Sequence, residues 1–316
     1  MEKRKLTKSI IIASCILFAG LCVTGYASNR SAIDGIRGDI YGSSSDSEEM
    51  TATQVHSPNV PELIVFAGDT VRFDNTDMRE RMDRELIAFT YSHQISLLMI
   101  KRAPKYFPII EPILKECGVP DDLKYLMVIE SNLDPEARST SGAAGFWQFM
   151  PATGKEFGLE VSATVDERYN VEKATRAACK YLKSAYAKYH DWMTVAASYN
   201  AGQGGISNRI GVQKQKSAFD LWLPAETSRY MFRILTAKMM LEDPASFGFK
   251  LKKNELYKYE KPARTVTVSG ETDLVKLASD NGVSFAALHR ANPWLRSTTL
   301  KPVSNTKKYQ IIIPEE

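Results

Sequence analysis

Residues 121–135 read DDLKYLMVIESNLDP and place one carboxyl group on the apolar face of a predicted helix. Leu123, Leu126 and Met127 follow the i, i+3 and i+4 spacing of a single helix face, and Glu130 comes at i+7 on that same face. Because burial disfavours a charged carboxylate, the pKa of Glu130 is expected to rise, so that the group holds a proton near neutral pH. A general acid needs this property. The alternative is a glutamate of the core that pairs with an arginine or caps a neighbouring helix.

Helical patterns continue on both sides of this stretch. Between Asp77 and Asp243 apolar residues recur at helical spacing, and no convincing alternating strand pattern is found. Pro104 and Pro108 are expected to interrupt the chain before the next helix. The predicted helices cover residues 109–117, 123–130, 171–189, 192–200 and 227–242. The sequence therefore predicts a mainly α fold with a helical domain over residues 76–245.

The last part of the chain has a different pattern. A length of 316 residues is enough for about two domains, so a second domain is expected there. After a basic linker over residues 246–263, a strand and two short helices are followed by a closing strand. These predicted elements cover residues 264–268, 273–281, 284–292 and 309–314. Residues 264–316 are therefore expected to form a small α+β module with strand-helix-helix-strand order.

The start of the chain carries the features of a signal peptide. A basic segment, MEKRKLTK, runs into the apolar stretch Ser9–Val23 and ends at Gly25-Tyr26-Ala27, a small-x-small cleavage site. The apolar stretch is shorter than the roughly 20 residues that span a bilayer, which favours removal of residues 1–27. Residues 28–75 are expected to be a flexible tether. The prediction is an exported protein of the periplasm or cell envelope, while membrane association through an uncleaved or lipidated N-terminus stays open.

Charge and side-chain spacing exclude several classes of function. The net charge is +4, and the first 27 residues carry four positive and one negative side chain, so the remaining chain carries only +1. A nucleic-acid-binding protein is not expected from this balance. The four histidines lack ligand spacing and no Cys-x-x-Cys occurs, so that no metal or cofactor is predicted. Cys117 and Cys179 are left either as a disulfide or as buried free thiols.

Three further clusters stand out, and one of them carries groups that suit a sugar ligand. In residues 139–151, STSGAAGFWQFMP, small residues allow close approach of the backbone, and Trp147, Gln148 and Met150 offer an apolar platform with one amide. Such a platform suits a sugar ring and its N-acetyl group, although a glycine-rich turn with a core Trp and Met has the same composition. SYNAG and ETSRY each lie at a helix end, where a cap or a first-turn charge is an alternative explanation.

Four motifs together resemble those of lytic transglycosylases of the soluble-transglycosylase-like superfamily: ES at 130–131, SGAAGFWQFMP at 141–151, SYNAG at 198–202 and ETSRY at 226–230. The similarity is greatest to the membrane-bound lytic murein transglycosylase D type, and it extends upstream through KRAPKYFPIIEPILKECGVPDDLKYL. It implies a lysozyme-like, mostly helical fold that cleaves the β-1,4 bond between N-acetylmuramic acid and N-acetylglucosamine. The implied partner is the peptidoglycan glycan strand, and the oligomeric state is left open.

The resemblance also implies roles for single residues. It makes Glu130 the sole catalytic acid and base, which protonates the glycosidic oxygen and then takes the proton of the sugar's C6 hydroxyl to close a 1,6-anhydro ring. The positions that match the family's substrate-binding residues are Ser139, Gln148, Met150, Tyr199, Asn200, Glu226 and Tyr230. Two rival functions remain, a muramidase that adds water at the same bond and a peptidoglycan-binding protein without activity.

Residues 264–316 resemble a LysM domain, a small module that binds glycans containing N-acetylglucosamine. Val266, Leu274, Leu277 and Ile313-Pro314 are among the matching positions. The resemblance implies a glycan groove bordered by Gly270, Glu271, Thr272, Asn292 and Pro293. The alternative is a degenerate LysM module that only packs or spaces.

Overall fold

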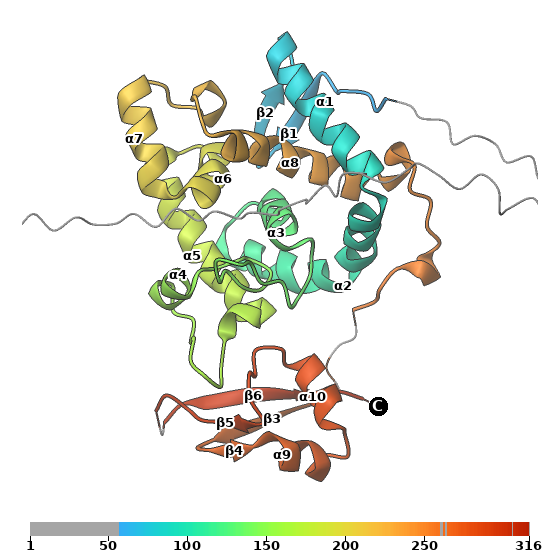
Figure 1. Cartoon of the computed structure of the whole chain (residues 1–316), viewed down its shortest axis with the longest axis vertical. Helices are drawn as coiled ribbons and strands as arrows, with labels where there is room; N and C mark the ends of the chain where they lie inside the picture. Colours follow the sequence, from blue (N-terminus) through green and yellow to red (C-terminus); the bar gives the residue numbers. More distant parts are fainter. Residues whose placement is uncertain (1–56, 260–261, 263, 305, 316) are drawn as a thin grey trace, which may run out of the picture. The chain divides into compact units, whose positions relative to one another are not determined.

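The computed structural model describes residues 57–259, 262, 264–304 and 306–315 (Figure 1). The predicted signal peptide and most of the predicted tether lie outside these ranges. In the part of the chain that is described, no helix combines the length and the apolar character that a membrane crossing requires.

A β-hairpin precedes the helices, so the prediction of a tether over residues 28–75 is wrong for its last part. β1 (Leu63–Phe66) and β2 (Asp69–Arg72) pair antiparallel and are joined by a two-residue turn. The alternate side chains are buried in the core: Ile64, Phe66, Val71 and Phe73. Ala67 N donates a hydrogen bond to Asp122 Oδ2 at 2.7 Å, which ties the turn to the helical domain. Burial of these side chains, at roughly 2 kcal/mol each, stabilises a hairpin that the polar residues before it do not suggest.

The helical domain is built around one short central helix. In the described residues its helices are α1 (Thr76–Tyr91), α2 (His93–Cys117), α3 (Lys124–Ser131), α4 (Pro151–Glu156), α5 (Val171–Tyr189), α6 (Trp192–Ala201), α7 (Gln203–Gln213) and α8 (Ala225–Glu242), with 3-10 turns η1 (Asp121–Leu123), η2 (Glu167–Tyr169) and η3 (Ala218–Asp220). α3 packs against both α2 and α8 in the middle of the domain (Figure 1). Leu123, Leu126 and Met127 have no exposed surface. The predicted mainly α fold and the predicted apolar face before Glu130 are both confirmed.

α2 is one continuous helix of 25 residues, so the predicted interruption at Pro104 and Pro108 is wrong. Pro104, Pro108 and Pro112 follow one another at four-residue spacing, which places all three on one face, and all three are exposed. The opposite face buries Met99, Ile100, Ala103, Ile110, Ile113 and Leu114. Burial of that face, at roughly 2 kcal/mol for each large side chain, offsets the backbone hydrogen bonds that the prolines remove.

The C-terminal module has the predicted strand-helix-helix-strand order. Its elements are β3 (Arg264–Ser269), β4 (Thr272–Asp273), α9 (Leu274–Asp280), α10 (Phe285–Ala291), β5 (Thr299–Leu300) and β6 (Lys308–Ile313). β3 pairs antiparallel with β6, with Val266 opposite Ile311, and the short β4 and β5 form a second pair that the sequence does not predict. The prediction of a small α+β module is confirmed, and the module belongs to the same compact unit as the helical domain.

Part of the predicted linker packs on the helical domain. Its 3-10 turns are η4 (Pro244–Phe247) and η5 (Lys253–Glu255). Phe247 is buried, and Tyr257 N donates a hydrogen bond to the carbonyl oxygen of Lys101 at 2.9 Å. The segment therefore follows the surface of α2 before it enters the module.

The two cysteines of the described chain are free thiols, which decides between the two alternatives that the sequence leaves open. Cys179 is buried, and Cys117 is partly buried. Burial of Cys179, together with its hydrogen bond to Cys117, raises the pKa of the Cys179 thiol. A thiol that holds its proton in this way is a poor nucleophile.

Gly145 allows a test of how tightly the loop before α4 is packed. Its φ is +72°, and a Cβ at this position would lie 1.9 Å from the carbonyl oxygen of Arg168. We expect Gly145→Ala to lower the free energy of unfolding by about 3 kcal/mol, because overpacking and backbone strain both contribute. Gly118→Ala is the matched control: Gly118 has a φ of +68° but nothing within 4 Å of its Cβ position. The control should cost about 1 kcal/mol in urea unfolding followed by circular dichroism; equal losses would contradict the close packing at Gly145.

Candidate active site

A cavity of about 150 Å³ opens where α3 and α6 end, beside the loop that leads into α4. The residues that line it are Glu130, Ser139, Ala143, Gln148, Phe149, Met150, Thr153, Tyr181, Tyr199, Asn200 and Gly202. Six of the residues predicted for the site are among them: Glu130, Ser139, Gln148, Met150, Tyr199 and Asn200. The fold thus gathers three of the four sequence motifs around one small space. Residues 139–150 are called the active-site loop below.

Glu130 lies in the last turn of α3, at the end of the buried apolar face. The Tyr230 hydroxyl donates a hydrogen bond to Glu130 Oε1 at 2.6 Å. Burial raises the pKa of Glu130 to about 7, whereas the hydrogen bond from Tyr230 and the charge of Arg233 lower it and Glu226 raises it. At neutral pH the carboxyl group can therefore both give and accept a proton.

The buried Tyr230 and the partly buried Tyr199 lie near this carboxyl group with neutral hydroxyls. Burial raises the pKa of Tyr199 and of Tyr230 well above the ordinary value of 10. The Tyr199 hydroxyl donates to the carbonyl oxygen of Trp147 at 2.6 Å, and the Tyr199 and Tyr181 rings lie edge to face with centres 5.0 Å apart. Tyr199 therefore ties α6 to the active-site loop, while Tyr230 reaches Glu130 directly.

The third and fourth motifs contact each other through side chains. Thr227 Oγ1 donates a hydrogen bond to Asn200 Oδ1 at 2.7 Å. Asn200 Nδ2 donates in turn to Glu226 Oε1 at 3.5 Å. The predicted residues Glu226 and Tyr230 do not line the cavity themselves. Glu226 contacts Asn200 and Tyr230 contacts Glu130, and both of these partners line the cavity.

The active-site loop offers one hydrogen-bond acceptor and one donor. Gln148 has a φ of +45°, and its Nε2 donates to the carbonyl oxygens of Ala137 at 3.1 Å and Gly145 at 2.8 Å. Because both amide hydrogens are used, Gln148 Oε1 is the atom left for a ligand. Ser139 Oγ accepts a hydrogen bond from Ala143 N at 3.0 Å, which leaves the hydroxyl hydrogen free to donate.

The sequence does not single out Tyr181 and Thr153, which also line the cavity. Tyr181 is one of 14 tyrosines and lies on α5, far along the chain from each motif. Its hydroxyl donates to the carbonyl oxygen of Ser198 at 3.1 Å. Helical spacing after Ala177 and Ala178 places Tyr181 near the buried face of α5, but this signal does not separate a core tyrosine from one that faces a cavity.

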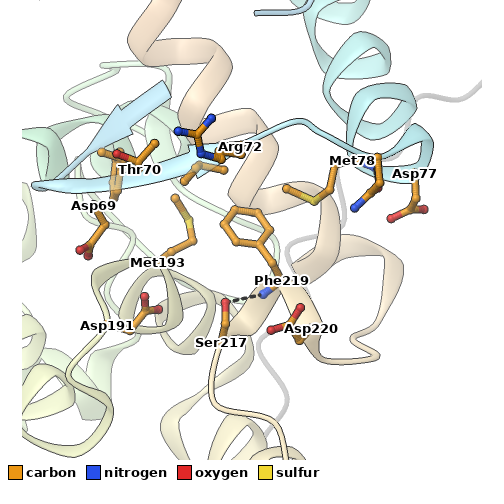
Figure 2. Close-up of a pocket in the computed structure, with 13 residues that line it drawn as sticks. Asp69, Thr70, Arg72, Asp77, Met78, Asp191, Met193, Ser217, Phe219 and Asp220 are labelled. Carbon is orange, nitrogen blue, oxygen red and sulfur yellow. Dashed lines mark hydrogen bonds between the residues drawn. The ribbon is translucent and has the colours of Figure 1, made fainter. Parts of the chain in front are cut away.

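A larger cavity of about 340 Å³ lies at the other end of α6 (Figure 2). Figure 2 shows Asp69, Asp191 and Asp220 around it, together with Met193 and Phe219. Asp191 is engaged as the N-cap of α6, and no residue predicted for the site lines this cavity. Neither here nor elsewhere in the described ranges do three or more His, Cys, Asp or Glu side chains gather to hold a metal ion. The smaller cavity, which holds Glu130, is therefore the candidate active site.

The residues predicted for the LysM groove lie in two places: Gly270, Glu271 and Thr272 at the turn between β3 and β4, and Asn292 and Pro293 after α10. Glu271 is exposed and lies 3.5 Å from Lys301 Nζ. Asn292 has no exposed surface, and its amide makes three hydrogen bonds, to the carbonyl oxygens of Leu288 and Ile312 and from Ile312 N. The Asn292 amide is therefore engaged inside the module, while the turn before β4 is open.

Comparison with known families agrees with these two parts of the chain. Residues 107–221 match the family described as the transglycosylase SLT domain. Residues 264–316 match the soluble lytic transglycosylase C-terminal LysM-like domain. The chain therefore carries an SLT domain followed by a LysM-like domain, which confirms the resemblance that the four motifs indicate.

The chain is also similar to individual proteins. The chain is 29% identical over 247 residues to the Escherichia coli (strain K12) protein named membrane-bound lytic murein transglycosylase D, and the match covers 76% of this chain and 53% of that protein. It is 38% identical over 90 residues to the peptidoglycan transglycosylase gp16 of phage T7, which is 28% of this chain and 7% of that protein. Among solved structures, the 70 kDa soluble lytic transglycosylase of Escherichia coli is similar at 16% identity with a TM-score of 0.38, covering 60% of this chain and 34% of that chain. The chain thus spans about half the length of the first of these relatives.

The raised pKa of Glu130 makes the folded state less stable at high pH. The folded state binds this proton more tightly than the unfolded state, where the pKa is 4.5, so stability is lost as the pH rises from 4.5 to about 7. We expect Glu130→Gln, which cannot ionise, to raise the free energy of unfolding by up to about 3 kcal/mol at pH 8 and by little at pH 4.5. Denaturant unfolding at both pH values measures the difference. The same gain at both would contradict the raised pKa.

Proposed function

We propose that the protein is a lytic transglycosylase of the cell envelope that cleaves the β-1,4 bond between N-acetylmuramic acid and N-acetylglucosamine in peptidoglycan. The observation that carries this proposal is a single carboxyl group, Glu130, with a pKa of about 7 in a cavity whose other lining side chains are uncharged. The SLT domain and the names of the relatives support the same class of reaction.

One carboxyl group is sufficient when the substrate supplies the nucleophile. Most glycosidases use two carboxyl groups, the second as a nucleophile or as a base for water. Among the described residues that line the cavity, Glu130 is the only acid. Protonated Glu130 gives its proton to the glycosidic oxygen as the bond from C1 breaks. The carboxylate then takes the proton of the C6 hydroxyl while O6 bonds to C1, which forms the 1,6-anhydro ring and restores the acid.

The hydrogen-bonding groups of the active-site loop suit an N-acetylated sugar. An N-acetyl group presents one N–H donor and one carbonyl acceptor. Gln148 Oε1 is available to accept from the first, and the Ser139 hydroxyl is available to donate to the second. Met150 and Tyr181 add apolar surface for the sugar ring. A site of this composition distinguishes an N-acetyl sugar from a plain hexose by leaving the amide and hydroxyl unpaired when the N-acetyl group is missing.

Tyr230 sets the acidity that the two proton transfers need. Burial alone would raise the pKa of Glu130 further and make the group a weak acid. The hydrogen bond from Tyr230 to Oε1 stabilises the carboxylate and opposes that rise. A pKa near 7 is the best compromise for a group that acts first as an acid and then as a base.

The proposed place of action is the cell envelope. The signal-peptide pattern over residues 1–27 predicts export, and the first relative is named membrane-bound. The proposed partner is the peptidoglycan glycan strand. In the LysM-like domain we assign glycan contact to the open turn at Gly270, Glu271 and Thr272.

Mass spectrometry of the products released from purified peptidoglycan tests the reaction. We expect muropeptides that end in 1,6-anhydro-N-acetylmuramic acid. Glu130→Gln should lower their release by at least about a thousandfold, because the same group performs both proton transfers. Asp134→Asn is the matched control: Asp134 is the nearest other acid of the helix end, and it accepts from Glu136 N and lies 3.5 Å from Arg102. Reducing ends would identify a muramidase instead, and binding without release would identify a glycan-binding protein.

Tyr230→Phe tests the balance that sets the pKa of Glu130. Because the lost hydrogen bond lowers that pKa, the alkaline limb of the profile of kcat/KM against pH should move to higher pH. Turnover at neutral pH should fall roughly tenfold, since a hydrogen bond to a charged group is removed. Tyr125→Phe is the control, because the Tyr125 hydroxyl bonds to the remote Glu242. An unshifted alkaline limb would show that Tyr230 does not set the acidity.

A further inference from the structure

Residues 160–169, called the connecting segment below, contact both the active-site loop and the LysM-like module. The segment lies between α4 and α5 and ends in η2. Its Val165 and Tyr169 share one hydrophobic cluster with Ala144 of the active-site loop and with the core of the module, which includes Leu295. The connecting segment is therefore packed between the loop that lines the cavity and the C-terminal module.

Arg168 holds both ends of the glycine-rich part of the active-site loop. Its side chain is buried, and its Nη1 donates to the carbonyl oxygens of Gly142 at 2.7 Å and Phe149 at 2.8 Å. Asp166 accepts from Arg168 Nε at 2.9 Å and from Nη2 at 2.7 Å, which fixes the plane of the guanidinium group. The Arg168 carbonyl oxygen also lies where a side chain at Gly145 would be. The shape of the loop thus depends on the position of Arg168.

The module contacts the connecting segment through backbone hydrogen bonds. Val165 and Leu295 form an antiparallel bridge, and neither has exposed surface. Two hydrogen bonds flank the bridge, from Asp166 N to the carbonyl oxygen of Trp294 at 2.8 Å and from Arg296 N to that of Thr164 at 2.9 Å. The residue that orients Arg168 is therefore itself bonded to the module.

A charged contact lies beside the bridge. Glu160 is 8% exposed, and its Oε2 accepts from Lys307 Nζ at 2.5 Å and from the Tyr309 hydroxyl at 2.9 Å. Lys307 Nζ also lies 3.7 Å from Oε1 of the buried Glu167. Lys307 is thus the cation bonded to Glu160, and it lies near Glu167, whose Oε1 also accepts from Lys173 Nζ at 2.5 Å. Removing Lys307 would leave the buried carboxylate of Glu160 without its cation, which is strongly unfavourable.

From these contacts we propose that the LysM-like module is a fixed support for the active-site loop, acting through the connecting segment, with Arg168 and Asp166 as positioning residues. The proposal rests on the proposed function for its effect on turnover. The side of the predicted glycan groove that follows Asn292 is used for this packing, since Trp294 is 3% exposed and Leu295 is fully buried. This role corresponds to the alternative from the sequence in which the module packs against the protein. Of the predicted groove, only the turn before β4 is then left for a glycan.

Hydrogen exchange of the full chain tests the support without requiring activity. Lys307→Glu places a third carboxylate beside Glu160 and Glu167 and should detach the module. We expect amide exchange in peptides that cover residues 139–150 to become faster by roughly tenfold or more. Lys276→Glu is the control of equal charge change, because Lys276 pairs with Asp280 on the surface of the same module. Exchange in residues 139–150 that stays at the wild-type rate in Lys307→Glu would overturn the proposal.

Turnover of a short soluble peptidoglycan fragment supplies the second readout. Lys307→Glu should lower kcat roughly tenfold with little change in KM, because misplacement of the loop affects the reacting geometry. Arg168→Lys, which keeps the charge but loses the two-pronged contact, should act in the same direction. Loss of wall binding with unchanged exchange and unchanged kcat would make the module a glycan anchor and overturn the support role.

Two further comparisons keep the outcomes separate. If the wild-type chain releases no product, the proposed function fails, and the exchange experiment still decides the support role. If Lys307→Glu loses its folded circular dichroism signal, Lys307→Met replaces it, since that change removes the cation without adding a carboxylate. Wild-type exchange in Lys307→Met would then overturn the proposal, and faster exchange confined to residues 139–150 and the module would support it.

Discussion

The burial of one carboxyl group at the end of α3 is the constraint on which the other features of this protein depend. Leu123, Leu126 and Met127 occupy the core between α2 and α8, and the helical repeat then places Glu130 on the same face. The carboxyl group is partly buried there and faces the cavity that it lines. Burial raises its pKa to about 7, which destabilises the folded state at neutral pH and at the same time produces a usable acid and base.

The other side chains that line the cavity with Glu130 are uncharged, and in the proposed function this lets a single carboxyl group serve two proton transfers. Tyr199 and Tyr230 stay protonated because they are buried as well. Amides, hydroxyls and apolar side chains line the remainder of the cavity. The pKa of Glu130 is therefore a balance of opposing effects. Desolvation raises it, whereas the hydrogen bond from Tyr230 and the charge of Arg233 lower it. The larger cavity at the other end of α6, by contrast, is lined by several aspartates.

The active-site loop is held from three directions, and this arrangement joins the two domains into one functional unit. Tyr199 bonds to it from α6, Arg168 bonds to both of its ends, and the LysM-like module fixes the segment that carries Arg168. Close approach is possible only because Gly145 has no side chain. A module of this kind changes the rate of a reaction through geometry, and the same contacts reduce the surface with which it can bind a glycan.

Features that depend on neighbours along the chain were predictable from the sequence, and features that depend on distant partners were not. The mainly α class, the apolar face that leads to Glu130 and the order of the C-terminal elements all follow from local spacing, whereas the motif residues of the cavity were predicted from the resemblance to a family. The hairpin at β1 and β2, the unbroken α2 and the glycine-containing α7 are stabilised by what they pack against, so local propensity misjudged them. Arg168 carries no local signal, and the helical spacing of Tyr181 does not separate a core tyrosine from one that faces a cavity. By itself the sequence determined which groups are available for catalysis; tertiary structure alone decided which of them meet, because burial and hydrogen bonding are properties of surroundings that the chain order does not specify.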